Sequence, residues 1–197
     1  MVKKAVFVSG GGTNLQALID QEIHIDLVLS SRSDAYALER AAKAGIPSVV
    51  CGRKQFSSQA EYDQAIVRIL RENEIDMVIL AGFLSILGEE VIKAYPERIL
   101  NIHPSLIPSF CGKGYYGLKV HEEALKRGVK VTGATVHLVN EIPDGGRILL
   151  QKAVYVQDGD TPEILQKRVM EEAEWILLPQ AARMLEKQIE EEKSCRQ

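Results

Sequence analysis

The sequence has few of the residues that would indicate a disulfide framework, a metal centre or a membrane anchor. It contains three cysteines in 197 residues, Cys51, Cys111 and Cys195, which are too few and too widely spaced for a disulfide scaffold or a zinc site. No apolar run approaches the roughly 20 residues of a transmembrane helix, and no signal peptide is recognisable near the N-terminus. We therefore expect reduced thiols, no metal, no membrane contact and a cytoplasmic location.

A strong excess of one charge is also absent. The chain has 24 basic and 27 acidic residues, for a formal net charge of −3, and the basic residues form no stripe. This balance gives no reason to expect nucleic acid as a partner. The length predicts a single domain over residues 1–197, because two full domains would be tight. Either a monomer or a homodimer is compatible with these features.

Short apolar runs alternate with helical patterns through the first hundred residues. This alternation predicts an α/β fold, a parallel sheet with helices on both faces. Thr13 and Asn14 are expected to cap the first helix. Strands are expected at 5–8, 25–29, 47–50, 77–80 and 99–102, and helices at 15–20, 34–44, 59–74 and 89–94.

The pattern changes after residue 118. A helix is expected at 120–126, followed by strands at 131–138 and 148–156 that are joined by a turn at 143–146. This pair looks antiparallel, so the sheet should be mixed. A helical tail is expected from 161 to 191, kinked or broken near Pro179 because proline lacks a backbone N–H.

Polar or glycine-rich segments follow three of the predicted strands, at 10–14, 81–87 and 101–105. Ligands of parallel sheets bind beyond the carboxyl ends of the strands, so these segments should line one crevice. Strand alternation puts Asn101 and His103 on the same face. With Asp144 they supply a carboxamide, an imidazole and a carboxylate, which can stabilise an oxyanion and move protons during acyl transfer. A structural histidine and an ordinary turn aspartate are the alternatives.

The glycine run of residues 10–12 suits either a tight strand-to-helix turn or an anion site, because exposed N–H groups at a helix start attract phosphate. It is a poor dinucleotide fingerprint, since Leu15 stands where a third glycine belongs. It also lacks the lysine of a Walker A loop. The glycine- and aromatic-rich segment 110–117 could be a mobile lid or a surface loop.

Five motifs together resemble the phosphoribosylglycinamide formyltransferases. They are Ser-Gly-Gly-Gly-Thr-Asn at 9–14, Leu-Ala-Gly-Phe at 80–83, Asn-Ile-His-Pro-Ser at 101–105, the pattern from His137 to Gly146, and Ile148 with Gln151. The resemblance runs from about residue 4 to 185. It implies a single-domain formyltransferase fold, with a mostly parallel, twisted seven-stranded sheet and an antiparallel C-terminal part. A phosphate-binding half is implied at about 1–100, and a folate and catalytic half at about 101–185.

The resemblance also implies an activity. The formyl group of 10-formyltetrahydrofolate, a co-substrate, would pass to the amine of glycinamide ribonucleotide in purine synthesis, by direct attack of that amine and without a metal. Asn101 and His103 would stabilise the oxyanion. Asp144 would assist by raising the pKa of His103, which is expected at a solvent-reached strand end.

Binding residues follow from the same motifs. Gly12, Thr13 and Asn14 match the loop that holds the substrate phosphate, and Glu174 matches a residue that contacts the ribose. The Glu174 match requires one extra residue after Val169. The residues that match the folate site are Leu84, Ser85, Ile86, Leu87, Asn101, Asn140, Glu141, Ile142, Pro143 and Asp144.

Two positions depart from the family pattern. Gln59 stands where the family often has an arginine near the folate tail, and the loop from Cys111 to Gly117 is longer than in many relatives. Two alternative functions stay open, a formyltetrahydrofolate hydrolase and a nonenzymatic folate- or nucleotide-binding module.

Overall fold

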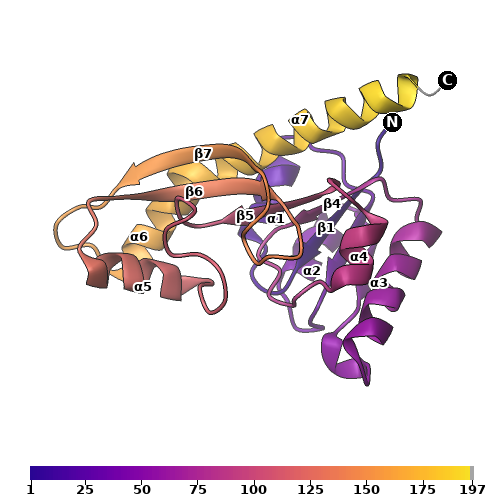
Figure 1. Cartoon of the computed structure of the whole chain (residues 1–197), viewed down its shortest axis with the longest axis horizontal. Coiled ribbons are helices and arrows are strands. Elements are labelled where there is room, and N and C mark those ends of the chain that lie inside the picture. The colour runs from indigo at the N-terminus through magenta and orange to yellow at the C-terminus, as the bar shows by residue number, and fades with distance from the viewer. Residues whose placement is uncertain (196–197) are drawn as a thin grey trace.

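A seven-stranded sheet organises the computed structural model, which describes residues 1–195 (Figure 1). The strand order is β3-β2-β1-β4-β5-β6-β7. The first five of these strands are parallel, whereas β6 runs antiparallel to both β5 and β7. The predicted mixed sheet is thereby confirmed. The strands are β1 Lys4–Val8, β2 Leu27–Ser30, β3 Ser48–Val50, β4 Met77–Leu80, β5 Ile99–His103, β6 Val131–Leu138 and β7 Ile148–Tyr155.

Helices occur where the sequence pattern predicts them, although several ends differ. Thr13 and Asn14 lie inside the first helix, so their predicted capping role is wrong. The N-cap is Gly12, whose left-handed backbone (φ 70°) turns the chain into the helix. The helical elements are α1 Thr13–Asp20, α2 Ala37–Lys43, η1 Arg53–Gln55, α3 Gln59–Glu72, α4 Glu89–Ala94, α5 Leu118–Arg127, α6 Pro162–Val169, the π-helical turn η2 Met170–Glu174 and α7 Trp175–Ser194.

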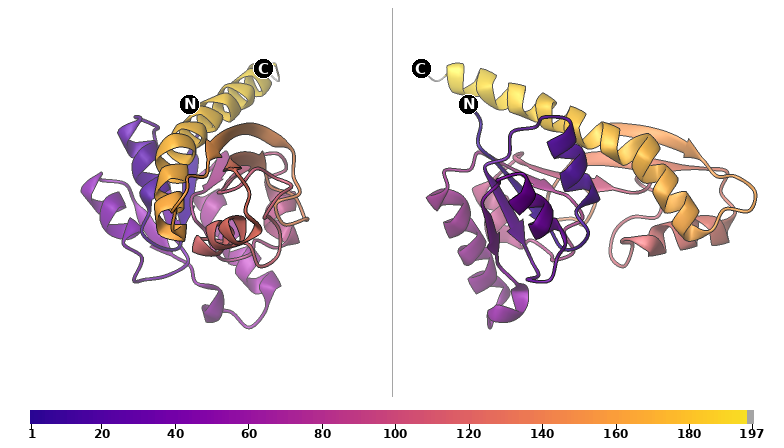
Figure 2. Two further views of the ribbon diagram at one scale, coloured as in Figure 1. Left: turned by 90° about the vertical axis from the view of Figure 1, so that its left-hand side faces the viewer. Right: turned by 180° about the vertical axis from the view of Figure 1, so that it is seen from behind.

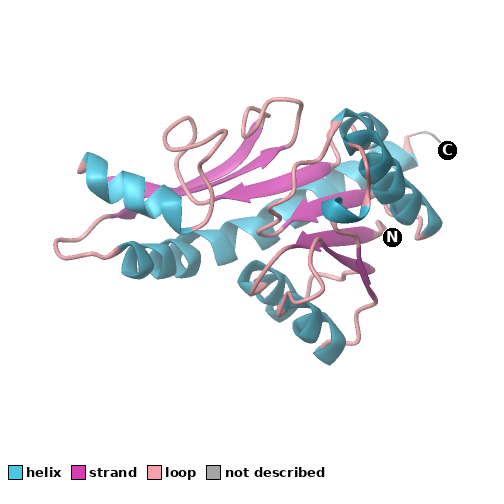
Figure 3. Ribbon diagram, turned by 90° about the horizontal axis from the view of Figure 1, so that it is seen from below, coloured by secondary structure: helices cyan, strands magenta, loops and turns pink. Residues whose placement is uncertain are grey.

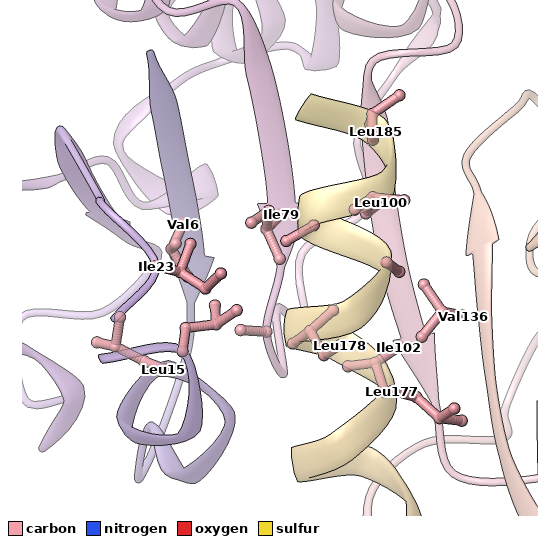
Figure 4. Packing of buried hydrophobic residues seen from close by; sticks show 14 of the residues in the cluster. Val6, Leu15, Ile23, Ile79, Leu100, Ile102, Val136, Leu177, Leu178 and Leu185 are labelled. Carbon is pink, nitrogen blue, oxygen red and sulfur yellow. The ribbon is translucent and has the colours of Figure 1, made fainter. Parts of the chain in front are cut away.

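Buried side chains form two clusters, one on each face of the sheet. Alternation along β1 places Val6 in one cluster and Phe7 in the other. On the first face, Leu15 of α1 and Leu178 of α7 pack against the sheet (Figure 4). On the second face, Tyr62 of α3 occupies the cluster of Phe7. Both faces are therefore covered by helices, as the alternating pattern predicts.

The C-terminal helix α7 runs along the molecule (Figure 2). It continues through Pro179, so of the predicted kink or break, the break is wrong. A proline cannot donate to the carbonyl four residues earlier, which here belongs to Trp175. The side chain of Gln21 supplies the missing donor, with its Nε2 2.7 Å from that carbonyl oxygen. A contact from outside the helix thus replaces the lost bond.

The irregularity of the helical tail lies earlier, in the π-helical turn from Met170 to Glu174. A π-helical turn accommodates one residue more than regular α-helix does. It coincides with the extra residue that the family match requires after Val169. Its consequence is that Glu174 faces α1.

The antiparallel hairpin of β6 and β7 extends the sheet away from its parallel part. Helices α5 and α6 lie side by side at that extended end (Figure 3). At the opposite end β1 contacts α7, and the buried Lys4 Nζ lies 2.5 Å from Glu186 Oε1 of α7. The order of the parallel strands reverses between β1 and β4, which is where ligands of such sheets bind.

Candidate active site

A cavity of about 760 Å³ opens beyond the carboxyl ends of β4 and β5. Its walls come from the loop after β4, the turn between β6 and β7, and the loop before α5. All ten residues that match the folate site line this cavity, and their contact with folate stays a prediction. Residues that the sequence analysis did not assign to the folate site also line it: Leu80, Phe83, Gly112, Lys113, Gly114, Tyr115, Tyr116, His137 and Val139.

The structure brings Asn101, His103 and Asp144 together in this region. Asn101 Nδ2 donates to Asp144 Oδ1 at 3.4 Å. His103 Nδ1 lies 3.6 Å from the other carboxylate oxygen, Oδ2. Asn101 and His103 are two residues apart in β5 and reach the same carboxylate because strand alternation directs them to one face. The carboxylate therefore lies between a neutral donor and an imidazole.

Asp144 is held by a closely packed turn. Asn140 Oδ1 accepts from the backbone N–H of Ile142 at 3.0 Å, and Asn140 Nδ2 donates to Gly145 O at 3.3 Å. A side chain at Gly146 would put its Cβ 1.7 Å from Leu138 O, so only glycine fits there. Asp144 itself has a positive φ of 55°, which aspartate tolerates better than most residues. The turn and the proposed catalytic role are thus compatible, because the turn directs the Asp144 carboxylate toward Asn101 and His103.

The loop after β5 covers His103 and Asp144. The carbonyl oxygen of Phe110 lies 2.8 Å from His103 Nε2, and the N–H of Gly112 donates to Asp144 Oδ2 at 2.8 Å. A carbonyl only accepts, so Nε2 carries a proton and Nδ1 faces Asp144. The imidazole therefore has an acceptor at each nitrogen, which is the arrangement that a protonated histidine requires.

Burial works against that protonated form. His103 is 4% exposed, so the expectation of a solvent-reached position is wrong. Burial lowers the pKa of His103 below its ordinary value of 6.5, although Asp144 and the Phe110 carbonyl act in the opposite direction. The effect of Asp144 on the pKa of His103 thus has the expected sign, but the effect of burial is larger and the net shift is downward. Burial raises the pKa of Asp144, but His137, His103 and the Gly112 N–H together bring it below its usual value.

His137 is a further polar neighbour of these residues, and no role in the site was predicted for it from the sequence. It stands directly opposite Asn101 in the pairing of β5 and β6. Its Nε2 lies 3.0 Å from Asn101 Nδ2 and 3.5 Å from Asp144 Oδ1, so it can accept from the amide or, when protonated, donate to the carboxylate. Its Nδ1 donates to Leu138 O at 2.9 Å, which fixes the ring. Strand register was the signal that could have found this contact.

His121 lies in α5 and is fully buried, without a hydrogen-bond partner among residues 1–195 for either ring nitrogen. Burial, with a smaller contribution from His103, lowers the pKa of His121 to about 4. At neutral pH it is therefore uncharged.

A second group of polar side chains lies between α1 and the π-helical turn. Asn14 Nδ2 donates to Glu174 Oε2 at 2.7 Å, and Thr13 Oγ1 lies 3.6 Å from Met170 Sδ. Burial raises the pKa of Glu174 to about 7, with Asn14 partly offsetting the rise. The other amide atom, Asn14 Oδ1, is buried without a hydrogen-bond partner in the described chain.

The glycine-rich segment adjoins the cavity rather than lining it. None of residues 10–14 belongs to the cavity wall, so the predicted single crevice holds for the loop after β4 and for Asn101 only. The two parts are joined by Ser9, whose Oγ accepts from the N–H of Leu84 at 2.8 Å. Gly10 and Gly11 have open space where a side chain would stand, whereas a Cβ at Gly12 would lie 2.6 Å from Ala37 Cβ.

Residues 1–195 contain neither a candidate metal site nor a membrane-spanning helix. No group of three or more histidine, cysteine, aspartate or glutamate side chains in this range is arranged to hold a metal ion. No helix in this part of the chain is long and apolar enough to span a membrane.

Comparisons with known proteins agree on one family. The model of the formyl transferase family matches residues 2–181. The chain is 44% identical over 190 residues to the trifunctional purine biosynthetic protein adenosine-3 of Gallus gallus, covering 93% of this chain and 18% of that protein. It is 41% identical over 178 residues to the phosphoribosylglycinamide formyltransferase of Haemophilus influenzae, covering 87% of this chain and 82% of the relative.

Solved structures agree with these relatives. The glycinamide ribonucleotide transformylase 1 of Symbiobacterium toebii superposes with a TM-score of 0.87 at 41% identity, over 94% of this chain and 88% of that one. The chain spans 13–18% of the length of the trifunctional relatives. It spans 61% of the chloroplastic phosphoribosylglycinamide formyltransferase of Arabidopsis thaliana, with which it is 45% identical over 177 residues.

Proposed function

The chain belongs to the formyl transferase family, and we propose that it transfers the formyl group of 10-formyltetrahydrofolate to the amine of glycinamide ribonucleotide. One observation carries the proposal: the Asp144 carboxylate lies between Asn101 Nδ2 and His103 Nδ1, beside a cavity of about 760 Å³. Related proteins named as phosphoribosylglycinamide formyltransferases support the choice of both substrates. In this proposal the chain acts in purine synthesis, and the folate is a co-substrate.

The proposed reaction needs no nucleophile from the protein. The substrate amine attacks the formyl carbon, and the carbonyl oxygen becomes an oxyanion. Asn101 and protonated His103 stabilise this oxyanion electrostatically, and electrostatic stabilisation of this kind is usually the largest single contribution to catalysis of acyl transfer. The bond between the formyl carbon and the folate nitrogen then breaks, and the proton released by the amine passes to that nitrogen.

Asp144 assists in two ways in this proposal. Its charge stabilises the protonated imidazole, because the acceptors at Nδ1 and Nε2 are already in place. The developing oxyanion adds a further negative charge beside His103, so protonation of the ring becomes more favourable during the reaction than in the unliganded protein. Proton uptake by His103 is thereby coupled to formation of the oxyanion.

We assign the ribonucleotide to the region beside the cavity. Gly12, Thr13 and Asn14 stand at the start of α1, where backbone N–H groups attract a phosphate. Glu174 and Asn14 Oδ1, which has no partner in the described chain, provide acceptors for ribose hydroxyls. The link between Ser9 and Leu84 places this group next to the cavity wall.

The remaining parts of the proposal concern organisation. We propose one domain, with the phosphate-binding half at about 1–100 and the folate and catalytic half at about 101–185. We also propose a cytoplasmic enzyme that acts on small molecules only, without nucleic acid or membrane, as a monomer or homodimer. The dispersed charge of −3 and the scarcity of cysteine support this choice.

A spectroscopic assay tests the proposal. The protein is incubated with 10-formyltetrahydrofolate in the presence and in the absence of glycinamide ribonucleotide, and loss of the formyl group is followed by absorbance. We expect deformylation that depends on the ribonucleotide. Deformylation without it, accompanied by formate, would indicate a hydrolase, and no deformylation by a protein that binds the folate would indicate a binding module.

A further inference from the structure

The charge of the large cavity is uneven. Lys113, in the loop before α5, is the only lysine or arginine among the described residues that line it, whereas Glu141 and Asp144 are acidic. The Lys113 side chain is exposed and makes no ion pair with any described residue from 1 to 195. Within this part of the chain, the cavity therefore contains one free positive charge, on a loop that faces the catalytic carboxylate and amide side chains.

The co-substrate carries negative charge at the end remote from its formyl group. A folate joins a pterin and an aminobenzoyl ring to glutamate, which has two carboxylates. If the formyl group reaches Asn101, these carboxylates extend toward the mouth of the cavity. A buried or partly desolvated carboxylate requires a cation or several donors.

Gln59, which the resemblance places near the folate tail, is already engaged in other contacts. Its Oε1 accepts from Arg53 Nε at 3.1 Å, and its Nε2 donates to Asp63 Oδ1 at 2.7 Å and to Ile86 O at 3.2 Å. These bonds hold the loop after β4 against α3. A neutral amide whose donors and acceptor are occupied is a poor partner for the folate tail.

We propose that Lys113 binds a glutamate carboxylate of the folate co-substrate and thereby determines the preference for folates that carry a glutamate tail. Tyr115 and Tyr116 line the same cavity and offer flat surfaces for the aminobenzoyl ring. This inference rests on the proposed function. It adds a specificity determinant on the loop before α5.

The position of Lys113 also links the tail to the catalytic residues. Its neighbour Gly112 donates to Asp144 Oδ2 at 2.8 Å, and Phe110 O accepts from His103. A carboxylate that holds Lys113 in place therefore also holds the segment that bonds the catalytic pair. A folate without glutamate should leave this segment less constrained.

The experiment compares two co-substrates in the intact protein, 10-formyltetrahydrofolate and 10-formyltetrahydropteroate, which lacks glutamate. In the wild type we expect KM for the glutamate-bearing compound to be about tenfold lower, the loss typical of one charge-assisted contact. Lys113→Ala should abolish that preference and leave KM for the pteroate compound unchanged. Lys113→Glu should reverse it, and added salt should weaken it in the wild type. Lys126→Ala, which removes an exposed lysine of α5 outside the cavity, is the matched control.

The outcomes separate this inference from the proposed function. No turnover of either compound by the wild type would refute the proposed function. Normal turnover with the same glutamate preference in wild type and Lys113→Ala would overturn the inference alone. A preference that persists in Lys113→Ala and disappears in Arg53→Ala would also overturn it, and would place the tail on the α3 side of the cavity. Calorimetric titration with folic acid and pteroic acid supplies the same comparison without catalysis.

Discussion

The carboxylate of Asp144 faces the imidazole of His103 across 3.6 Å, yet burial holds the pKa of His103 below its ordinary value. His103 therefore has hydrogen-bond acceptors that suit a protonated imidazole, whereas its lowered pKa favours the neutral ring. A catalytic group of this kind gains its proton when negative charge develops beside it. The proposed chemistry of the site depends on this relationship.

Removing the Asp144 charge should make His103 still harder to protonate. Asp144 raises the pKa of His103, so Asp144→Asn should lower that pKa further, and turnover at neutral pH should fall strongly while substrate binding changes much less. Asn keeps the left-handed turn, so stability should change little. NMR titration of His103 in both proteins measures the cause directly. An unchanged pKa with normal turnover would reduce Asp144 to a turn residue.

Loss of the imidazole should be severe for activity. His103→Ala should lower turnover by about two to four orders of magnitude, the usual range for a proton-transfer group. Because His103 is buried and donates to the Phe110 carbonyl, the substitution should also cost about 1–3 kcal/mol of unfolding free energy. Steady-state kinetics and denaturant unfolding of the same preparation measure the two effects. Activity near the wild-type level in the folded variant would remove His103 from the mechanism.

The glycine loop allows phosphate binding to be separated from folding. A Cβ at Gly11 would have no atom within 4 Å, and the backbone there has no positive φ, so Gly11→Ala should fold normally and raise KM for the ribonucleotide while leaving KM for the folate unchanged. Gly12→Ala is the contrasting variant, because its Cβ would meet Ala37 at 2.6 Å in a left-handed backbone. That variant should lose stability as well. Equal effects of Gly11→Ala on both substrates would show that the loop is wrongly assigned.

Glu174 should make stability depend on pH. Burial raises the pKa of Glu174 from 4.5 to about 7 in the folded protein. The stability contribution of its protonated form is therefore complete below pH 4.5 and is lost as the pH rises through about 7. Glu174→Gln should abolish this dependence. The unfolding free energy of the variant minus that of the wild type should therefore be larger at about pH 8 than at about pH 5. Denaturant unfolding at both pH values checks this, and a constant difference would contradict the assigned pKa.

Much of the fold can be predicted from the sequence, because burial of one face of a helix or strand imposes a simple periodicity on its apolar residues. The strands Met77–Leu80 and Val131–Leu138 occur at the predicted residues, since apolar runs bounded by turns specify them. The helix start at Gly12 and the continuation of α7 through Pro179 were not predictable. Both depend on a backbone conformation or a distant side chain, Gln21, which no local pattern shows.

The candidate site shows the same division. The proximity of Asn101 and His103 follows from strand alternation, which is a local property. The contact of His137 with Asn101 depends on the register of two strands, and the closure by Phe110 and Gly112 depends on a loop path. The pKa of His103 could not be inferred, because its sign depends on whether burial or the Asp144 charge is larger.

Transfer of a labelled formyl group tests the central claim most directly. The protein is given 10-formyltetrahydrofolate with ¹³C in the formyl carbon, together with glycinamide ribonucleotide, and the label is followed by NMR. We predict that the label appears in a new amide on the ribonucleotide, at a rate that His103→Ala reduces by about two to four orders of magnitude. Label that appears as formate, or that stays on the folate while both substrates are bound, would contradict this mechanism.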